Sequence, residues 1–140
     1  MDAIILAGGK GTRLKSVINN VPKPLAPVNG IPFLDVLLHQ LDKSNCVEKV
    51  ILAVGYKAEQ IIENYENCSK YRFEIIFSIE KEALGTGGAI KMAIANTNSD
   101  SFLVLNGDSY TDVNISKLIH THNVSKASMT MVLREVENAN

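Results

Sequence analysis

Short apolar runs that are rich in β-branched residues recur along the chain, and each is about as long as a buried strand. Several of them lack the alternation of polar and apolar residues that a half-exposed sheet requires. A strand covered by helices on both faces has no such alternation, so the pattern predicts a largely parallel sheet. The predicted strands are Ala3–Ala7, Val50–Val54, Phe73–Ser78, Phe102–Leu105 and Met129–Leu133.

Helical periods lie between the predicted strands. The first is a leucine stripe that follows Pro32, a residue that the first turn of a helix tolerates. A shorter stripe begins at Ile90, and Asn114 is placed to cap a third helix. The stripes consist of Leu34, Leu37, Leu38 and Leu41; of Ile90, Ala93 and Ile94; and of Ile115, Leu118 and Ile119. Strands that alternate with helices predict an α/β fold, here a Rossmann-like three-layer α/β/α domain with a mainly parallel sheet.

The composition limits the size and the partners of this fold. At 140 residues with 46% hydrophobic content, the chain can bury one core, so we expect a single domain over residues 1–140. Its 14 basic and 15 acidic residues give a net charge of -1, without the basic block that binds nucleic acid or a membrane surface. The apolar N-terminal stretch runs into Gly8 and is too short to span a membrane. Cys46 and Cys68 lack disulfide or zinc-site spacing and suit a reducing compartment, so we expect a cytoplasmic protein with small-molecule partners.

A glycine-rich loop follows the first predicted strand, at the end of the sheet where ligands bind in open α/β folds. Its sequence is Gly8-Gly9-Lys10-Gly11-Thr12-Arg13. The glycines let main-chain N–H groups approach an anion, and a hydroxyl and a guanidinium lie beside them. The loop is not a Walker A loop, and Leu14 stands where the GxGxxG pattern requires glycine. We predict phosphate binding; a glycine-rich turn without a ligand explains the glycines equally well.

Lys23 is a second candidate for phosphate binding. It lies between Pro22 and Pro24, and the prolines restrict the backbone, so we expect an extended, stiff segment. A point charge held on a stiff backbone suits a phosphate group. The alternative is a solvated surface lysine in a proline-rich turn.

Four motifs follow one another along nearly the whole chain. They are Leu6–Leu14, Pro22-Lys23-Pro24, Glu80–Gly88 and Asn106-Gly107-Asp108. Their order resembles the signature of the sugar-phosphate nucleotidylyltransferase family. The resemblance implies the nucleotide-diphospho-sugar transferase version of the Rossmann-like fold. It also implies an enzyme of nucleotide-sugar biosynthesis for cell-surface polysaccharides, which joins a nucleoside monophosphate to a sugar 1-phosphate and releases pyrophosphate.

The resemblance implies a role for each residue that matches a family motif. The main chain of Gly8–Gly11 would wrap the nucleoside triphosphate, and Arg13 would hold its β and γ phosphates. Lys23 would contact the α-phosphate, where negative charge builds as the sugar phosphate attacks. Asp108 would ligate Mg²⁺, the implied cofactor; the alternative is an ordinary turn residue after Asn-Gly.

The residues implied by the resemblance form two sets. The catalytic set is Arg13, Lys23 and Asp108, with Asp108 as the metal ligand. The nucleotide-binding set is Leu6, Ala7, Gly8, Gly9, Gly11, Thr12, Arg13, Lys23, Glu80, Gly85, Thr86 and Asn106.

The loop that begins at Glu80 is predicted to read the base. Gly85 and Gly87 allow the main chain to approach a flat ring, and Thr86 is placed to cap the following helix. The Glu80 carboxylate accepts two hydrogen bonds, which fits the adjacent N1–H and N2–H₂ donors of guanine and favours GTP. The alternatives are a solvated charged loop, or a uridylyl- or thymidylyltransferase of the same family.

Within the family, residues 78–88 most resemble guanylyltransferases that act on heptose 1-phosphate or mannose 1-phosphate. Ala83 stands where many of these relatives have proline, which loosens the loop without removing a functional group. In the family, a second metal-binding aspartate and the lysine that holds the sugar phosphate come from segments after the core sheet. Because the sequence stops at Asn140, we expect a C-terminally truncated enzyme; the alternative is a nucleotide-binding module without transferase activity.

The sequence assigns no function to its histidines, which are His39, His120 and His122. None has a carboxylate partner or a metal-ligand spacing along the chain. The sequence also leaves the identity of the sugar and the oligomeric state unpredicted.

Overall fold

The computed structural model describes residues 1–9, 21–133 and 135 of the chain. The chain divides into two compact units, Met1–Tyr110 and Thr111–Asn140. The first unit holds the sheet, and the second holds one helix. The expectation of a single domain over residues 1–140 stays a prediction.

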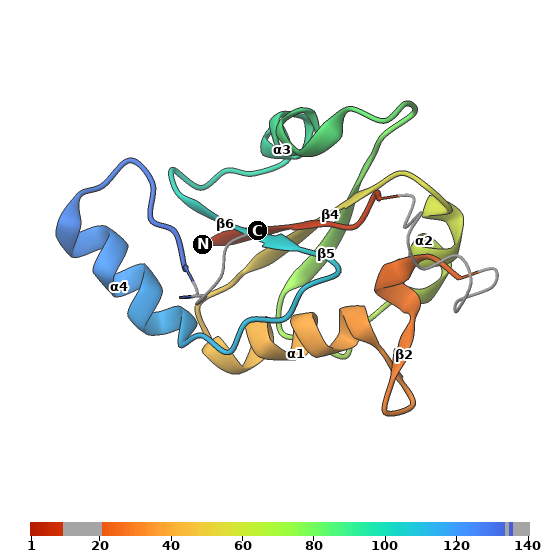
Figure 1. Ribbon diagram of the computed structural model, residues 1–140, viewed down its shortest axis with the longest axis horizontal. Helices are drawn as coiled ribbons and strands as arrows, with labels where there is room; N and C mark the ends of the chain where they lie inside the picture. The colour runs from red at the N-terminus through yellow and green to blue at the C-terminus, as the bar shows by residue number, and fades with distance from the viewer. Residues whose placement is uncertain (10–20, 134, 136–140) are drawn as a thin grey trace. The chain divides into compact units, whose positions relative to one another are not determined.

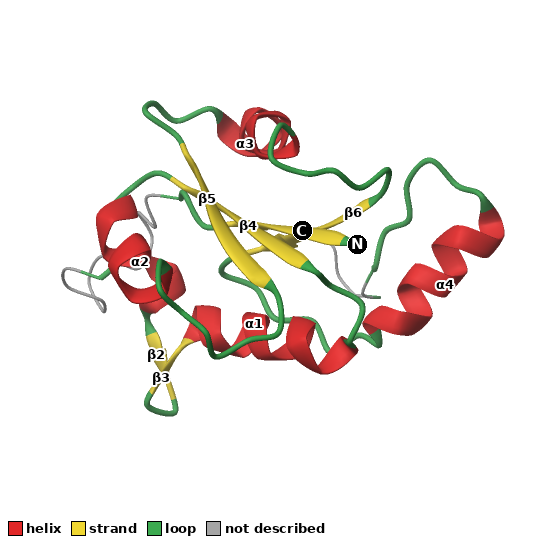
Figure 2. Ribbon diagram, turned by 180° about the vertical axis from the view of Figure 1, so that it is seen from behind, coloured by secondary structure: helices red, strands yellow, loops and turns green. Residues whose placement is uncertain are grey.

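A four-stranded parallel sheet forms the centre of the first unit (Figure 2). Its strands are β1 (Asp2–Leu6), β4 (Lys49–Val54), β5 (Glu74–Ile79) and β6 (Phe102–Asn106). Their order across the sheet is β5-β4-β1-β6, and every neighbouring pair is parallel. The parallel sheet and its first four predicted strands are confirmed, with small shifts at the strand ends.

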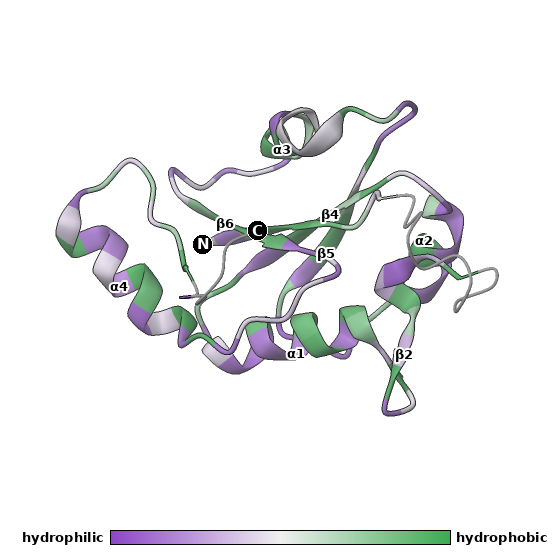
Figure 3. Ribbon diagram, viewed as in Figure 1, coloured by the Kyte–Doolittle hydropathy of each residue, from purple (hydrophilic) through white to green (hydrophobic). Residues whose placement is uncertain are grey.

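Helices cover both faces of this sheet (Figure 1). They are α1 (Phe33–Ser44) and α3 (Gly85–Ile94), on opposite faces, and α2 (Ala58–Tyr65), which contacts β5. The predicted leucine stripe of α1 is fully buried, whereas Ala89 and Ala93 of α3 pack on Ile4 and Ile51. The central strands are accordingly drawn as largely hydrophobic in Figure 3, as is much of α1. These layers confirm the predicted Rossmann-like α/β/α architecture.

A short 3₁₀ helix carries Lys23. This element, η2 (Lys23–Leu25), follows Pro22, whose backbone is extended and whose side chain is fully buried. The N–H of Ala26 donates to Lys23 O at 3.0 Å and closes the turn. The prediction of an extended segment is therefore wrong beyond Pro22, because the fixed φ of Pro24 fits a 3₁₀ turn as well as an extended chain.

A two-stranded antiparallel ribbon joins η2 to α1. It consists of β2 (Pro27–Val28) and β3 (Ile31–Pro32). The N–H of Phe33, the first residue of α1, donates to Ala26 O at 2.9 Å. The turn that carries Lys23 is thus tied to the start of α1.

Asp35, in the first turn of α1, links that helix to the end of α2. Its carboxylate accepts hydrogen bonds from Tyr65 Oη at 2.7 Å and from Lys70 Nζ at 2.9 Å. Burial raises the pKa of Asp35, but the hydrogen bonds from Tyr65 and Lys70 outweigh it, so the pKa lies below its ordinary value. Burial, followed by the bond to Asp35, raises the pKa of Tyr65, so the phenol stays protonated and donates. The network fixes the end of α1 that adjoins η2.

The chain builds the sheet outward from β1 in two directions. The chain adds β4 and then β5 on one side of β1, and afterwards crosses to place β6 on the other side. The order of the strands along the chain therefore reverses between β1 and β6. A crevice at the carboxyl ends of two such strands is the usual ligand site of open α/β sheets.

The second unit contains α4 (Ile115–Ser125). The Asn114 side chain accepts a hydrogen bond from Lys117 N–H at 2.9 Å, which confirms the predicted N-cap. The predicted strand Met129–Leu133 is wrong, because these residues are irregular and the first and last side chains are 73% and 79% exposed. An apolar run becomes a strand only where another strand pairs with its N–H and C=O groups, and no strand among the described residues does so.

Neither Cys46 nor Cys68 takes part in a disulfide, and both are partly buried. Cys46 Sγ donates to Ser44 O at 3.1 Å. Among the described residues, no helix is both long enough and apolar enough to cross a bilayer.

Candidate functional site

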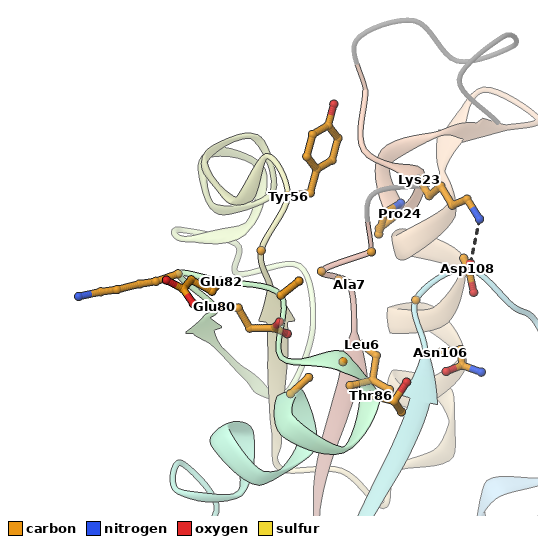
Figure 4. A pocket seen from close by; sticks show the side chains of 18 residues that line it. Leu6, Ala7, Lys23, Pro24, Tyr56, Glu80, Glu82, Thr86, Asn106 and Asp108 are labelled. Carbon is orange, nitrogen blue, oxygen red and sulfur yellow. Dashed lines mark hydrogen bonds and ion pairs between the residues drawn. The ribbon is translucent and has the colours of Figure 1, made fainter. Parts of the chain in front are cut away.

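A cavity of about 550 Å³ opens at the carboxyl ends of the strands (Figure 4). Segments that follow each of the four strands line it, and η2 contributes Lys23 and Pro24. From the predicted site, the structure brings together Leu6, Ala7, Gly8, Gly9, Lys23, Glu80, Gly85, Thr86, Asn106 and Asp108. Gly11, Thr12 and Arg13 lie outside the described residues, and their roles stay predictions.

A charged pair occupies the β6 side of the cavity. Lys23 Nζ donates to Asp108 Oδ2 at 3.2 Å, and Ser109 Oγ donates to Asp108 Oδ1 at 3.2 Å. The Lys23 side chain is 25% exposed and that of Asp108 is 48% exposed, so a ligand can reach both. A partly exposed pair of this kind contributes roughly 0–1 kcal/mol to the free energy of unfolding. A phosphate or a cation can therefore displace either partner at low cost.

Gly107 brings the ends of β1 and β6 into close contact. Its N–H donates to Leu6 O at 2.9 Å, and a Cβ at this position would lie 2.6 Å from the same oxygen. No larger residue fits there without moving the main chain. Sequence reasoning gave Gly107 no role, although a glycine directly after a predicted strand was a signal for close backbone approach.

Glu80 lies on the other side of the end of β1 from Lys23 and Asp108 (Figure 4). Its N–H donates to Val54 O at 2.8 Å, which continues the pairing of β5 with β4. Its Oε2 accepts a hydrogen bond from Leu84 N–H at 3.2 Å, so the carboxylate is held at the start of α3. Glu80 lines the cavity, and its role in reading the base stays a prediction.

Thr86 does not cap α3 as predicted. The helix begins at Gly85, which has a φ of 68°, and no side chain caps it. Thr86 thus lies inside the first turn, where its hydroxyl is not placed like that of an N-cap residue. The Glu80 carboxylate instead accepts from the main chain just before the helix. Thr86 remains in the lining of the cavity.

Gly55 and Tyr56 line the cavity and were missed by sequence reasoning. The N–H of Tyr56 donates to Gly8 O at 3.3 Å, and Tyr56 stands at the β4 side of the cavity (Figure 4). Their position directly after a buried strand was the available signal, because the other strands also end in cavity-lining residues.

Asp108 is the carboxylate beside the proposed phosphate site. Among the described residues, no group of three or more His, Cys, Asp or Glu side chains gathers to hold a metal. Mg²⁺ needs no such cage, because it is commonly held by one or two carboxylates together with phosphate oxygens and water. An accessible carboxylate across the cavity from Glu80 fits that donor set. No histidine lies among the described residues that line the cavity.

Comparisons with known proteins place the chain among nucleotidyl transferases. A D-glycero-alpha-D-manno-heptose 1-phosphate guanylyltransferase of Campylobacter jejuni subsp. jejuni is 49% identical over 118 residues, which cover 84% of this chain and 52% of that protein. The protein of the same name from Aneurinibacillus thermoaerophilus is 42% identical over 137 residues, or 98% of this chain and 59% of its own length. The crystal structure of HddC from Yersinia pseudotuberculosis complexed with GMP-PN matches with a TM-score of 0.78 and 42% identity, over 86% of this chain and 53% of that one.

The extent of these matches also matters. The chain spans about half the length of the relatives that it matches. The family described as nucleotidyl transferase matches residues 2–140, which is almost all of the sequence. This chain belongs to the nucleotidyl transferase family.

Proposed function

We propose that the chain is the nucleotide-binding part of an enzyme that transfers GMP from GTP to a sugar 1-phosphate. In this reaction a phosphate oxygen of the sugar phosphate attacks the α-phosphorus of GTP, a new P–O bond forms, and pyrophosphate leaves. The products are a GDP-sugar and pyrophosphate. The observation that carries the proposal is the placement of Glu80 and of the Lys23–Asp108 pair on opposite sides of the end of β1, in one cavity.

The side that holds Lys23 suits the triphosphate. Lys23 supplies a positive charge on a turn that is tied to α1, so the charge is preorganised for an α-phosphate that becomes more negative during attack. The main chain of Gly8 and Gly9 lies beside it in the cavity. We assign Arg13 to the β and γ phosphates because it ends the same glycine-rich loop.

Asp108 would hold Mg²⁺ in this proposal. When bound, the cation would neutralise charge on the phosphates and on the leaving pyrophosphate. The residues of this chain keep the carboxylate in place: Gly107 fixes the loop against β1, and Ser109 donates to one Asp108 oxygen.

The side that holds Glu80 suits guanine. A carboxylate accepts hydrogen bonds from two adjacent donors, and guanine presents N1–H and N2–H₂ side by side. The names of the relatives support this choice, since those above are guanylyltransferases and one solved structure holds GMP-PN. Heptose 1-phosphate is the first acceptor to test, and mannose 1-phosphate, which the name of a 34% identical relative from Mycobacterium tuberculosis includes, is the second.

We place the reaction in the cytoplasm, in nucleotide-sugar synthesis for cell-surface polysaccharides. The thiols of Cys46 and Cys68, which are not joined in a disulfide, support a reducing compartment.

Pyrophosphate release tests the proposal directly. The chain, and a longer form that contains it, are incubated with GTP, Mg²⁺ and either heptose 1-phosphate or mannose 1-phosphate. Release that requires the sugar phosphate supports the transferase. Tight GTP binding without release from either form would leave a nucleotide-binding module and overturn the enzyme.

The choice of base has its own test. GTP is expected to bind more tightly than UTP or dTTP, and Glu80→Gln should weaken that selectivity about tenfold, because one acceptor becomes a donor. Glu82→Gln is the matched control, since Glu82 lines the same cavity. Tighter binding of UTP or dTTP to the unmodified chain would reject guanine.

A further inference from the structure

The side chain of Glu80 lies close to two glycines that come from other loops. A Cβ at Gly8 would lie 3.2 Å from Glu80 Oε1 and 3.3 Å from Gly55 N. A Cβ at Gly55 would lie 3.4 Å from Gly8 O and 3.6 Å from Glu80 Cβ. The segments after β1, β4 and β5 therefore meet at a notch that Gly8 and Gly55 leave open.

Lack of space, and not backbone conformation, explains the glycine at position 8. Among the described residues, the glycines with positive φ are Gly30 and Gly85. Gly8 is not one of them, so an L-residue could adopt its backbone without strain. A side chain there would instead crowd Glu80 and Gly55, which would have to move by a few tenths of an ångström.

Gly9 provides the contrast within the same loop. It is adjacent in sequence and also lines the cavity, yet a Cβ there would meet no described atom within 4 Å. The two glycines thus differ in one respect that an experiment can use: only Gly8 contacts the Glu80 side chain.

Contacts with the neighbouring main chain fix the orientation of the Glu80 carboxylate. Its main chain is fixed by the bond to Val54 O at 2.8 Å, and its Oε2 by Leu84 N–H at 3.2 Å. Its Oε1 is limited by the main chain at Gly8. A carboxylate has about four lone-pair sites, so acceptor capacity remains for a ligand. Figure 4 shows the side chain pointing toward the end of β1.

We propose that Gly8 determines base specificity, because its missing side chain lets Glu80 hold both carboxylate oxygens toward the N1–H and N2–H₂ edge of guanine. This inference rests on the proposed function, in which Glu80 reads the base. It gives the first part of the glycine-rich loop a task besides contact with the triphosphate. A methyl group at position 8 would push Oε1 aside by a few tenths of an ångström, and the pair of hydrogen bonds would no longer fit the ring.

Inosine triphosphate (ITP) isolates the contribution of the base edge to binding. Its base lacks the N2 amino group, and its triphosphate is the same as that of GTP. The ratio of the two dissociation constants therefore reports on the base edge alone. We measure this ratio by calorimetry for the full chain and for Gly8→Ala and Gly9→Ala, with circular dichroism melts to verify folding. Gly8→Ala is expected to reduce the preference for GTP over ITP by about fivefold or more, as for a lost hydrogen bond to a charged group.

Gly9→Ala is the matched control. The substitution can change the affinity for GTP and for ITP, but the ratio of the two dissociation constants should stay at the wild-type value. An unchanged ratio in a folded Gly8→Ala chain, or an equal fall in both variants, would overturn the assignment of Gly8.

Glu80→Asp keeps the test decisive if Gly8→Ala does not fold. The shorter side chain withdraws the carboxylate from the notch while Gly8 stays in place, so the preference for GTP over ITP should fall. A wild-type ratio in Glu80→Asp would show that contact with the notch is irrelevant.

Failure of the proposed function has a different signature. Wild-type chain that binds GTP no more tightly than UTP or dTTP overturns both the guanine assignment and the role of Gly8. A wild-type chain that prefers GTP to UTP and dTTP, together with an unchanged ratio of GTP to ITP affinity in Gly8→Ala, overturns the role of Gly8 alone.

Discussion

Lys23 and Asp108 are 85 positions apart in the sequence, yet Lys23 Nζ lies 3.2 Å from Asp108 Oδ2. The pair brings together the two side chains to which the proposed reaction gives different ligands, an α-phosphate and a cation. Each side chain thus has a partner of opposite charge before any ligand arrives. Because the pair is partly exposed, its separation costs little.

Replacing Lys23 with methionine removes the charge and keeps an unbranched side chain. We expect turnover with GTP and a sugar 1-phosphate to fall roughly 100-fold, with a smaller change in KM, because the charge acts mainly on the transition state. Pyrophosphate release at saturating substrate gives the turnover. Lys91→Met, which alters an exposed lysine of α3, serves as the control. A wild-type rate in Lys23→Met would exclude the proposed role.

Asp108→Asn tests the metal site through binding. Mg²⁺ should tighten the binding of GTP to the unmodified chain, and Asp108→Asn should lose most of that gain because an amide oxygen is a weaker ligand for a hard cation. Titration of GTP with either Mg²⁺ or a chelator measures the gain. Asp100→Asn changes an exposed carboxylate outside the cavity and should behave as wild type. If Mg²⁺ tightens GTP binding equally in Asp108→Asn, the cation is held elsewhere.

Gly107→Ala tests the contact between the ends of β1 and β6. Its methyl group would lie 2.6 Å from Leu6 O, so the main chain must move. We expect a loss of roughly 1–3 kcal/mol in the free energy of unfolding, as for other overpacked sites, together with weaker GTP binding. Gly87→Ala is the control, because its Cβ would meet no described atom within 4 Å and alanine favours helices. Chemical denaturation should therefore show a lower free energy of unfolding for Gly107→Ala and a higher one for Gly87→Ala than for the unmodified chain.

Asp35→Asn tests the network between α1 and α2. The folded-state pKa of Asp35 lies below its ordinary value of 3.8, so its carboxylate stabilises the fold above that pH and loses this effect as pH falls through the folded pKa. At pH 7 the variant should lose roughly 1–2 kcal/mol of unfolding free energy, since Lys70 is mostly exposed. The difference in unfolding free energy between the variant and the wild type should disappear as the pH falls from about 5 to about 2. A gap that stays constant over this range would contradict the charge-based account.

Hydrophobic patterns in the sequence predicted the core of the first unit, because apolar side chains at regular spacing are usually the ones that become buried. The leucine stripe of α1 and the apolar run of β4 needed no tertiary information to be assigned. The helix α2 was missed, since it is only eight residues long, although its buried residues Ala58, Ile61 and Tyr65 follow a helical spacing. Met129–Leu133 was assigned wrongly because an apolar run does not reveal whether another strand will pair with it.

The candidate site was predicted in its residues but not in its contacts. Family motifs pointed to Lys23, Glu80 and Asp108, and the fold places all of them on one cavity. Contacts such as that of Gly8 with Glu80 depend on how three separate loops meet, which sequence spacing does not encode. The same is true of the hydrogen bond from Leu84 N–H to Glu80, which took the place of the predicted cap by Thr86.

The position of β1 between β4 and β6 has an evolutionary consequence. Apart from the glycine-rich loop after β1, the group proposed to choose the base follows β5 and includes Glu80, whereas the group proposed to handle phosphate and metal, Lys23 and Asp108, belongs to η2 or follows β6. A mutation in the first group can change which nucleotide is accepted without disturbing the second. Such a division lets proteins that share one fold come to use different nucleoside triphosphates while the transfer reaction itself stays the same.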